Sequence, residues 1–383
     1  MHPIIPLSEP VLDGNEAQYV QDCLKSGWVS TAGPWVNRFE KEFSAYVGTA
    51  GAVSVCNGTA ALHLALILAG VQNGDEVLVP TFTFIASVNA IRYAGGNPVF
   101  MDCDHHCNLD IQNVIRFLNE ECVFDGQKTV RKKSGKIVRA IVPVHIFGFP
   151  VDLNPLLEAA RKLNVLIIED AAESLGSRYL PSGKMTGTLG DFGCYSFNGN
   201  KVITSGGGGM LVCRSPELLA KARYLSTQAK DDDLFYIHHE IGYNYRLTSL
   251  QAALGIAQLE KIDQALSRRR ENFHSYQTLL NTFEEATLLQ EAENTQANYW
   301  LYTLIFRHSV DLKSIIDQLQ TRGVQARPAW MLNHLQKPYL QCEKYEITQA
   351  AHIQPRILNI PSSSNLTHKN IETVVRALKE SVS

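Results

Sequence analysis

One lysine in a glycine-rich loop offers the amine that a covalent reaction with an aldehyde would need. The stretch Ser196-Phe-Asn-Gly-Asn-Lys201 follows an apolar run, and the glycines 206–209 come shortly after it. A lysine is nucleophilic near neutral pH only when it is partly desolvated, and glycines let the backbone pack against a flat ring. The alternative is a flexible surface loop with a solvated lysine. The glycine run lacks the strand–turn–helix order of a dinucleotide-binding motif.

An aspartate stands at the end of a strongly apolar run. The residues Val165-Leu-Ile-Ile-Glu-Asp170 predict a buried strand, and ligands of open α/β sheets bind at the carboxyl ends of strands. A carboxylate at that place could keep a pyridine nitrogen protonated, which makes the ring an electron sink. Taken alone, Asp170 fits an ordinary acid that caps the next turn at least as well.

A third element joins a short strand to a helix through Asn57-Gly58-Thr59. The free N–H groups and the dipole of a helix start favour an anion, and Gly58 permits close approach of a ligand. Alone, the pattern also fits a plain helix cap by Asn57 or Thr59. Together, an anion cradle, a strand-end acid and Ser-x-x-x-x-Lys about thirty residues later have the layout of a pyridoxal phosphate site.

The elements that must position these residues alternate between strands and helices from residue 52 onward. Short apolar runs predict strands over Ala52–Val55, Val77–Pro80, Pro98–Met101, Ile137–Val144, Val165–Glu169, Phe192–Phe197 and Met210–Cys213. Helices are predicted over Thr59–Ala69, Ile85–Tyr93 and Leu153–Leu163. This order predicts an α/β fold with a mostly parallel central sheet and helices on both faces.

The two ends of the chain differ in character from this centre. Capping-box spacing at Asp13 and Glu16 predicts a helix to about Ser26, and Trp35–Tyr46 is amphipathic. The same spacing at Thr248 and Gln251 predicts one long helix to about residue 280. Later patterns predict a strand over Tyr299–Phe306 and helices over Leu312–Arg322 and Ile371–Leu378. We therefore expect a large α/β domain over 1–250, and the long helix with a small α+β domain over 251–383.

Composition favours a cytoplasmic globular enzyme. The chain has 383 residues, 45% of them hydrophobic, and a formal net charge of −3, so no nucleic-acid partner is expected. No run is long and apolar enough for a membrane helix, the N-terminus lacks the features of a secretory signal, and eight scattered cysteines fit a reducing compartment. The basic stretch Lys128–Arg139 fits a solvated hairpin better than a phosphate or membrane patch.

The chain resembles the DegT/StrS family of sugar aminotransferases over nearly its whole length. The matching stretches include NGTAALHLAL, GDEVLVPTFTFIASVNAI, IIEDAAESLGS, the lysine loop and GYNYRLTSLQAALG. The resemblance implies the aspartate-aminotransferase-like fold, known as fold type I, with pyridoxal 5′-phosphate as cofactor. It also implies a homodimer with shared active sites.

The resemblance assigns roles to individual residues. Lys201 would form the Schiff base, Asp170 would pair with the pyridine nitrogen, and Phe84 would stack on the ring. Gly58, Thr59 and Ser196 would hold the phosphate, and Asn244 would reach the phosphate bound by the neighbouring subunit.

Two stretches depart from the family pattern. Glu173 stands beside the cofactor's phenolic oxygen, where many members have Gln or His. The cluster Cys103, His105, His106 and Cys107 replaces a simpler acidic loop. Tetrahedral zinc sites usually draw ligands from separate turns, so we predict no metal and leave the role of the cluster open.

A lysine at position 201 also points to transamination, because family members that dehydrate sugars have His there. The implied reaction is a ping-pong transfer from glutamate, which leaves as 2-oxoglutarate, to a nucleotide-linked 4-keto-6-deoxy sugar. The GYNYR and STQAKDDD stretches favour a UDP-linked N-acetylated acceptor, with a GDP-linked perosamine-type acceptor as the alternative. A lyase or dehydratase, a non-catalytic cofactor-binding regulator and a structural oligomer are rival hypotheses for the function.

Two residues further along the chain are candidates for acceptor binding. Trp330 could stack on a sugar or base, and His334 could bond a hydroxyl or phosphate. Trp330 could equally fill the core, and His334 fits a satisfied or surface histidine.

Overall fold

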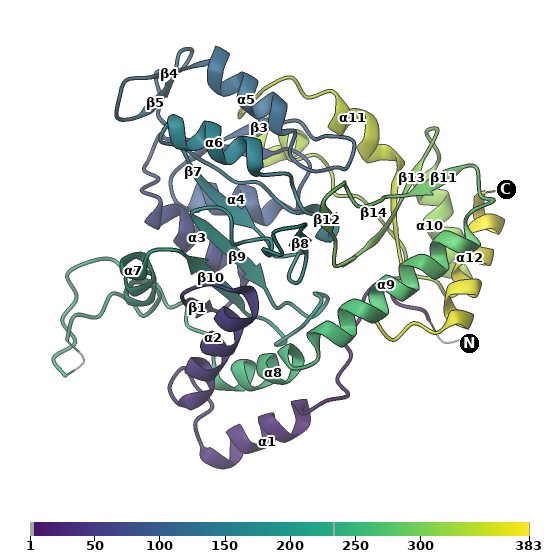
Figure 1. The fold of residues 1–383 in the computed structure, drawn as a ribbon, viewed down its shortest axis with the longest axis horizontal. Helices are drawn as coiled ribbons and strands as arrows, with labels where there is room; N and C mark the ends of the chain where they lie inside the picture. The colour runs from purple at the N-terminus through teal and green to yellow at the C-terminus, as the bar shows by residue number, and fades with distance from the viewer. Residues whose placement is uncertain (1–3, 233, 383) are drawn as a thin grey trace.

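A computed structural model describes residues 4–232 and 234–382, and its centre is an eight-stranded sheet. The strand order is β1-β10-β9-β7-β6-β2-β3-β15 (Figure 1). Only β10 runs antiparallel to its neighbours, so the sheet is mostly parallel, as predicted. The strands are β1 (Ala52–Val55), β2 (Glu76–Pro80), β3 (Asn97–Met101), β6 (Val138–Ile141), β7 (Leu166–Asp170), β9 (Phe192–Ser196), β10 (Gly209–Cys213) and β15 (Glu343–Lys344).

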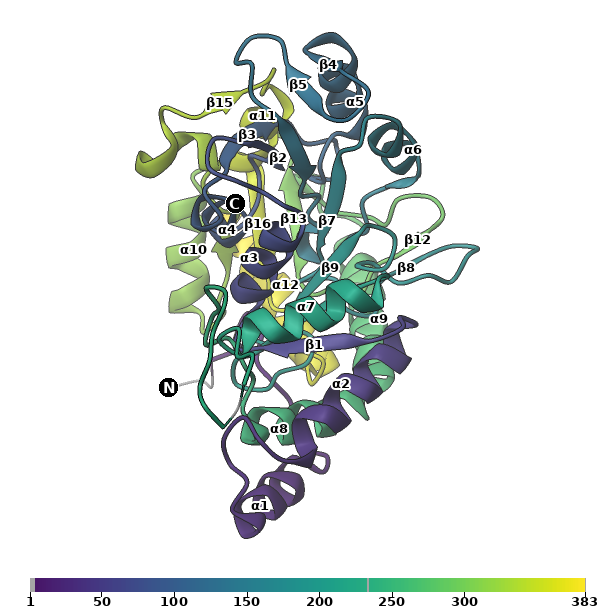
Figure 2. The same ribbon diagram turned by 90° about the vertical axis from the view of Figure 1, so that its left-hand side faces the viewer.

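Helices cover both faces of this sheet, which confirms the predicted α/β class. Successive strand residues point to opposite faces, so Val77 and Val79 of β2 join one apolar core and Leu78 joins another. Figure 2 shows α3 and α4 on one side of the sheet and α5 and α6 on the other. The helices of this part are α1 (Glu16–Ser26), α2 (Pro34–Val47), α3 (Gly58–Leu68), α4 (Ile85–Tyr93), α5 (Ile111–Glu120), α6 (Asn154–Lys162), α7 (Pro216–Ser226) and α8 (Ser249–Leu259).

The C-terminal part forms a smaller antiparallel sheet of four strands in the order β11-β13-β16-β14. Its strands are β11 (Ala286–Leu288), β13 (Tyr302–Phe306), β14 (Arg327–Pro328) and β16 (Ile357–Ile360), and its helices are α9 (Ile262–Leu279), α10 (Leu312–Thr321), α11 (Gln349–Ile353) and α12 (His368–Val382). Strand β15 of this part adds to the edge of the large sheet beside β3. The division of the chain at residue 250 stays a prediction.

Short elements complete the chain. They are the hairpin β4 (Cys122–Phe124) and β5 (Thr129–Arg131), the pair β8 (Arg178–Tyr179) and β12 (Thr295–Gln296), and four 3₁₀ turns, η1 (Ile146–Gly148), η2 (Asn333–Leu335), η3 (Lys337–Tyr339) and η4 (Gln354–Arg356). The basic stretch 128–139 includes β5 and therefore lies partly in this hairpin. No helix in the described ranges combines the length and apolarity needed to cross a bilayer.

The single long helix predicted after Thr248 is wrong, because the chain breaks between α8 and α9. Lys261 has φ −112° and ψ 5°, and its amine pairs with Asp13, while Glu260 accepts hydrogen bonds from Asn15 and Tyr19. These bonds to the N-terminal segment stabilise the non-helical conformation between α8 and α9. The capping box of Thr248 with the third helical residue is present, as predicted.

The capping box predicted at Asp13 and Glu16 does not form. Helix α1 starts after Asn15, and the Glu16 carboxylate accepts a 2.7 Å hydrogen bond from the N–H of Gly14. Asp13 is the ion-pair partner of Lys261 and does not cap the helix. The spacing fits a capping box, but the Asp13 carboxylate pairs with the distant Lys261 instead of with the helix N-terminus.

Candidate active site

A cavity of about 360 Å³ opens at the carboxyl ends of β7 and β9, beside the N-terminus of α3. Strand order places these ends together, because β7 and β9 are parallel neighbours. The cavity brings together eight of the ten predicted site residues, namely Gly58, Thr59, Phe84, Asp170, Glu173, Ser196, Lys201 and Trp330.

The N-terminus of α3 forms one wall of the cavity. The Asn57 side chain caps the helix by accepting a 2.7 Å hydrogen bond from the N–H of Ala60. A Cβ on Gly58 would lie 2.9 Å from the Cβ of Ser196, so only glycine lets β9 approach the helix this closely. Helix N–H groups and two hydroxyls, of Thr59 and Ser196, therefore meet where an anion would be stabilised.

Asp170 ends β7 at the floor of the cavity and is 4% exposed. Its Oδ2 accepts a 2.7 Å hydrogen bond from the hydroxyl of Ser87, and its Oδ1 accepts a 3.1 Å bond from the N–H of Ala172. Burial raises the pKa of Asp170, and these two bonds and the charge of Lys201 oppose that rise. A carboxylate so held can pair with a protonated ring nitrogen.

Lys201 and Glu173 face each other inside the cavity. The Nζ of Lys201 lies 3.7 Å from Oε1 of Glu173, and the Glu173 side chain is 5% exposed. Burial lowers the pKa of the lysine and raises the pKa of Glu173 to about 7. The other Glu173 oxygen accepts a 2.8 Å hydrogen bond from the N–H of Phe147. The lysine is therefore the desolvated amine that the sequence predicts.

Among the cavity residues that the sequence analysis did not single out, Ser87 and Trp300 contact the predicted Asp170 and Lys201 through their side chains. Ser87, the donor to Asp170, lies in the first turn of α4, three residues after Phe84. Trp300 comes from the distant segment before β13, and its ring lies 3.9 Å from Nζ of Lys201. The FIAS stretch could have indicated Ser87, whereas no local pattern marks Trp300.

Phe84 and Trp330 form the aromatic side of the cavity. Phe84 is 50% exposed, and its ring centroid lies 6.0 Å from that of Trp330. Trp330 also packs against Phe82 and Phe147, so its ring takes part in the core and also reaches the cavity. A flat ligand would therefore meet aromatic surface here.

Asn244 and His334 are the two predicted residues that do not line this cavity. Asn244 is exposed and forms a bridge with Thr227 at the base of the loop that follows α7. His334 turns its Nδ1 toward the hydroxyl of Thr81 at 2.6 Å, and burial lowers its pKa. The ring of His334 is therefore satisfied by a hydrogen bond within the protein.

The cysteine and histidine cluster before α5 has its two thiols in the core. Cys103 is 1% exposed and Cys107 fully buried, and burial raises the pKa of both. The rings of His105 and His106 contact each other with centroids 4.2 Å apart. Within 4–232 and 234–382, no group of three or more donor side chains is arranged to hold a metal ion.

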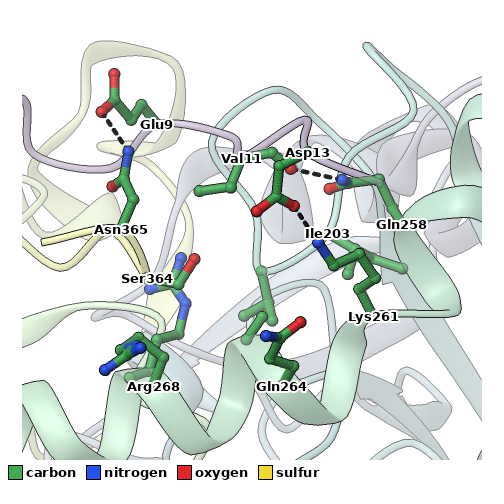
Figure 3. A pocket seen from close by; sticks show the side chains of 13 residues that line it. Glu9, Val11, Asp13, Ile203, Gln258, Lys261, Gln264, Arg268, Ser364 and Asn365 are labelled. Carbon is green, nitrogen blue, oxygen red and sulfur yellow. Dashed lines mark hydrogen bonds and ion pairs between the residues drawn. The ribbon is translucent and has the colours of Figure 1, made fainter. Parts of the chain in front are cut away.

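A second cavity of about 210 Å³ lies behind the lysine loop and is lined in part by Val202 and Ile203 (Figure 3). Five of its polar side chains pair with their neighbours: Asp13 with Lys261, Glu9 with Asn365, and Gln258 with the carbonyl of Val11. The amine of Lys201 belongs to the first cavity, so we place the candidate active site there.

The first cavity fits pyridoxal phosphate. It offers an anion site at a helix start, a buried acid for a ring nitrogen, an aromatic wall and one desolvated amine. Among the residues that the structure describes, no second lysine lines it.

Comparisons with known proteins agree with this geometry. Residues 10–379 match the model of the DegT/DnrJ/EryC1/StrS aminotransferase family. A GDP-perosamine synthase of Caulobacter vibrioides is 38% identical over 99% of this chain and 98% of its own. The putative pyridoxal phosphate-dependent aminotransferase EpsN of Bacillus subtilis is 36% identical, covering 99% and 96%. The aminotransferase TlmJ of Streptoalloteichus hindustanus superposes with a TM-score of 0.88 at 28% identity, covering 99% and 98%.

The family match spans nearly the whole chain, and the two relatives exceed a third in identity over almost their full lengths. The chain therefore belongs to the DegT/DnrJ/EryC1/StrS family of sugar aminotransferases and uses pyridoxal phosphate as its cofactor.

Proposed function

We propose that this aminotransferase moves an amino group from glutamate to the ketone of a nucleotide-linked 4-keto-6-deoxy sugar. One observation carries the proposal: the Lys201 amine is desolvated in a cavity that also holds Asp170 and the start of α3. Each of these groups serves a different part of pyridoxal phosphate, so their meeting in one cavity supports covalent attachment at Lys201.

The cavity residues divide the work of holding the cofactor. Gly58, Thr59 and Ser196 would bind the phosphate, and Phe84 would lie against the ring. Asp170 would keep the ring nitrogen protonated, with Ser87 and Ala172 fixing the carboxylate. Pyridoxal phosphate supplies an aldehyde for amines and a cationic ring that accepts electrons.

Lys201 and Glu173 would handle protons in the reaction. The Lys201 amine would have to be neutral to take a proton from the α-carbon of an amino donor, and its burial favours that state. Glu173 would contact the phenolic oxygen of the cofactor from its place 3.7 Å from the lysine. A carboxyl whose pKa is about 7 can donate or accept a proton there near neutral pH.

For the acceptor sugar, we favour a GDP-linked compound over the UDP-linked one that the sequence suggested. The reason is the Caulobacter relative, which is named a GDP-perosamine synthase. Trp330 lines the cavity and would contact the sugar or the base. His334 would contribute only if its bond to Thr81 were exchanged for one to the acceptor.

We propose a homodimer that completes the site. The loop after α7 projects from the body of the protein (Figure 1) and exposes Leu234, Phe235 and Ile241 by 77%, 72% and 86%. Large apolar side chains so exposed are typical of an interface. Asn244 at the base of this loop does not line its own cavity, which supports the expected contact with the partner's cofactor.

The dimer is tested by sedimentation of Ile241→Asp. The wild type should sediment as a dimer and the variant as a monomer, while Leu180→Asp, on another exposed loop, should stay dimeric. In a further variant, Asn244→Ala, the dimer should persist and pyridoxal phosphate should bind more weakly. Wild-type protein that sediments as a monomer contradicts the proposal.

The reaction is tested with glutamate and a panel of GDP-, UDP- and dTDP-linked 4-keto-6-deoxy sugars, with product masses as the readout. We expect amination of the GDP-linked sugar to have the highest kcat/KM. A higher kcat/KM for a UDP-linked N-acetylated sugar would contradict the GDP assignment. A non-catalytic regulator would keep its absorption spectrum unchanged when glutamate is added, whereas the enzyme should convert to the pyridoxamine form.

A further inference from the structure

Trp300 contacts both the backbone and the amine of the lysine loop. Its indole N–H donates a 2.6 Å hydrogen bond to the carbonyl of Asn200, the residue before Lys201. Its ring centroid lies 3.9 Å from Nζ of Lys201. The side chain is 3% exposed and lines the same cavity as the amine. A residue about one hundred positions away in the chain thus covers the reactive group.

Asn298 links the backbone of Trp300 to the backbone of Glu173. The Oδ1 of Asn298 accepts a 2.8 Å hydrogen bond from the N–H of Trp300. Its Nδ2 donates to the carbonyls of Glu173 and Leu175 at 2.9 and 3.0 Å. Asn298 therefore connects the backbone at Trp300 to the backbone at Glu173, and the Trp300 indole connects this support to the lysine loop.

The surroundings of the amine explain what the ring contributes. Glu173 on the segment after β7, at 3.7 Å, and Asp170 at the end of β7 face Lys201 with their carboxyl groups. Trp300 covers the amine with an apolar face that excludes water. An aromatic face attracts an ammonium group, but loss of hydration disfavours it, and burial has the larger effect on Lys201.

We propose that Trp300 is a positioning residue for Lys201, which fixes the lysine loop through the Asn200 carbonyl and holds the amine beside Glu173 under a water-excluding ring. This inference rests on the proposed attachment of the cofactor to Lys201. Trp300 acts through the lysine and its loop.

Two substitutions separate the two contacts. Trp300→Phe keeps an aromatic face but removes the N–H that bonds Asn200, whereas Trp300→Ala removes both. Trp330→Phe is the matched control, because Trp330 lines the same cavity and packs against Phe147. Circular dichroism and thermal unfolding establish that each variant is folded.

The first readout uses cofactor-free protein. Acylation of Lys201 by trace acetic anhydride is followed by peptide mass spectrometry as a function of pH. Trp300→Ala should raise the pH at which acylation of Lys201 is half-maximal by about one pH unit or more, because water reaches the amine. Trp300→Phe and Trp330→Phe should leave it near the wild-type value. An unchanged midpoint in Trp300→Ala would overturn the role of the ring.

The second readout is the dissociation constant of pyridoxal phosphate. Trp300→Phe should weaken binding by roughly two- to tenfold, because the Asn200 carbonyl then keeps only the hydrogen bond from the Ser8 hydroxyl and the loop loosens. If Trp300→Phe binds pyridoxal phosphate as tightly as the wild type, the proposed role of the hydrogen bond is wrong. This measurement tests the proposal even if Trp300→Ala does not fold. A wild-type protein without any borohydride-stable adduct at Lys201 would refute the proposed function instead, while the acylation profile still tests Trp300.

Discussion

The hydroxyl of Ser87 donates a 2.7 Å hydrogen bond to Oδ2 of Asp170, the acid that ends β7 at the floor of the cavity. This bond favours the ionised carboxylate, which burial disfavours. An ionised Asp170 is what a protonated ring nitrogen requires. The strength of cofactor binding should therefore depend on a serine that need not touch the cofactor.

Ser87→Ala should weaken the binding of pyridoxal phosphate by roughly tenfold, because a bond to a charged group contributes about 1.5–3 kcal/mol. Equilibrium titration of cofactor-free protein measures the change. The matched control is Ser174→Ala, because Ser174 is also fully buried but its hydroxyl has no hydrogen-bond partner among the described residues. Equal affinities in the Ser87 and Ser174 variants would show that the Ser87 bond contributes nothing.

The pKa of Glu173 predicts a pH-dependent stability of the cofactor-free protein. Burial raises this pKa from 4.5 to about 7, so the folded protein holds the proton more tightly than the unfolded chain. The resulting stabilisation is complete below pH 4.5 and is lost as the pH rises through about 7.

Glu173→Gln removes this titration. As the pH rises from 4.5 to 7, the wild type should lose stability that the variant keeps. The free energy of unfolding of the variant, minus that of the wild type, should therefore increase by up to about 3 kcal/mol. Urea unfolding across that range measures the difference, and Glu158→Gln on the exposed face of α6 is the control. A difference that stays constant with pH would mean that Glu173 titrates normally.

Gly148 gives Asn298 the space from which it supports Trp300 and Glu173. A Cβ at this position would lie 1.9 Å from Oδ1 of Asn298, and the backbone φ is +97°. Gly148→Ala should therefore lower the free energy of unfolding by several kcal/mol, since a buried hydrogen-bonded side chain must move.

Gly183→Ala is the control for backbone strain alone, because its φ is +70° and nothing lies within 4 Å of the added Cβ. It should cost about 1 kcal/mol. Urea denaturation compares the two variants. Equal losses of stability would mean that the space beside Asn298 is not needed.

The sequence predicted the parts of the site that depend on local patterns. The β7 run, the glycine-marked helix start and the lysine loop each have a local signature, and all three meet in one cavity as expected. Strand positions agreed to within a few residues because apolar runs with β-branched residues fix them; the run 137–144, for example, gives β6 at Val138–Ile141.

Long-range contacts account for what the sequence did not reveal. Trp300 lies about one hundred residues after Lys201 in the chain and meets it only in the folded structure, so no spacing within the chain records the contact. The break at Lys261 depends on Asp13, about 250 residues earlier, and periodicity alone could not place it. Likewise, the direction of the His334 ring is set by Thr81 and not by its neighbours in the chain.

The proposed activity depends on covalent attachment of pyridoxal phosphate to one lysine. The most direct measurement is borohydride treatment of the protein with pyridoxal phosphate, followed by peptide mass spectrometry. We predict a near-visible absorption band that borohydride removes, with the cofactor then fixed to Lys201 and to no other lysine, and neither result in Lys201→Ala. A protein that stays colourless, or an adduct on a lysine such as Lys261 behind the loop, would contradict this attachment.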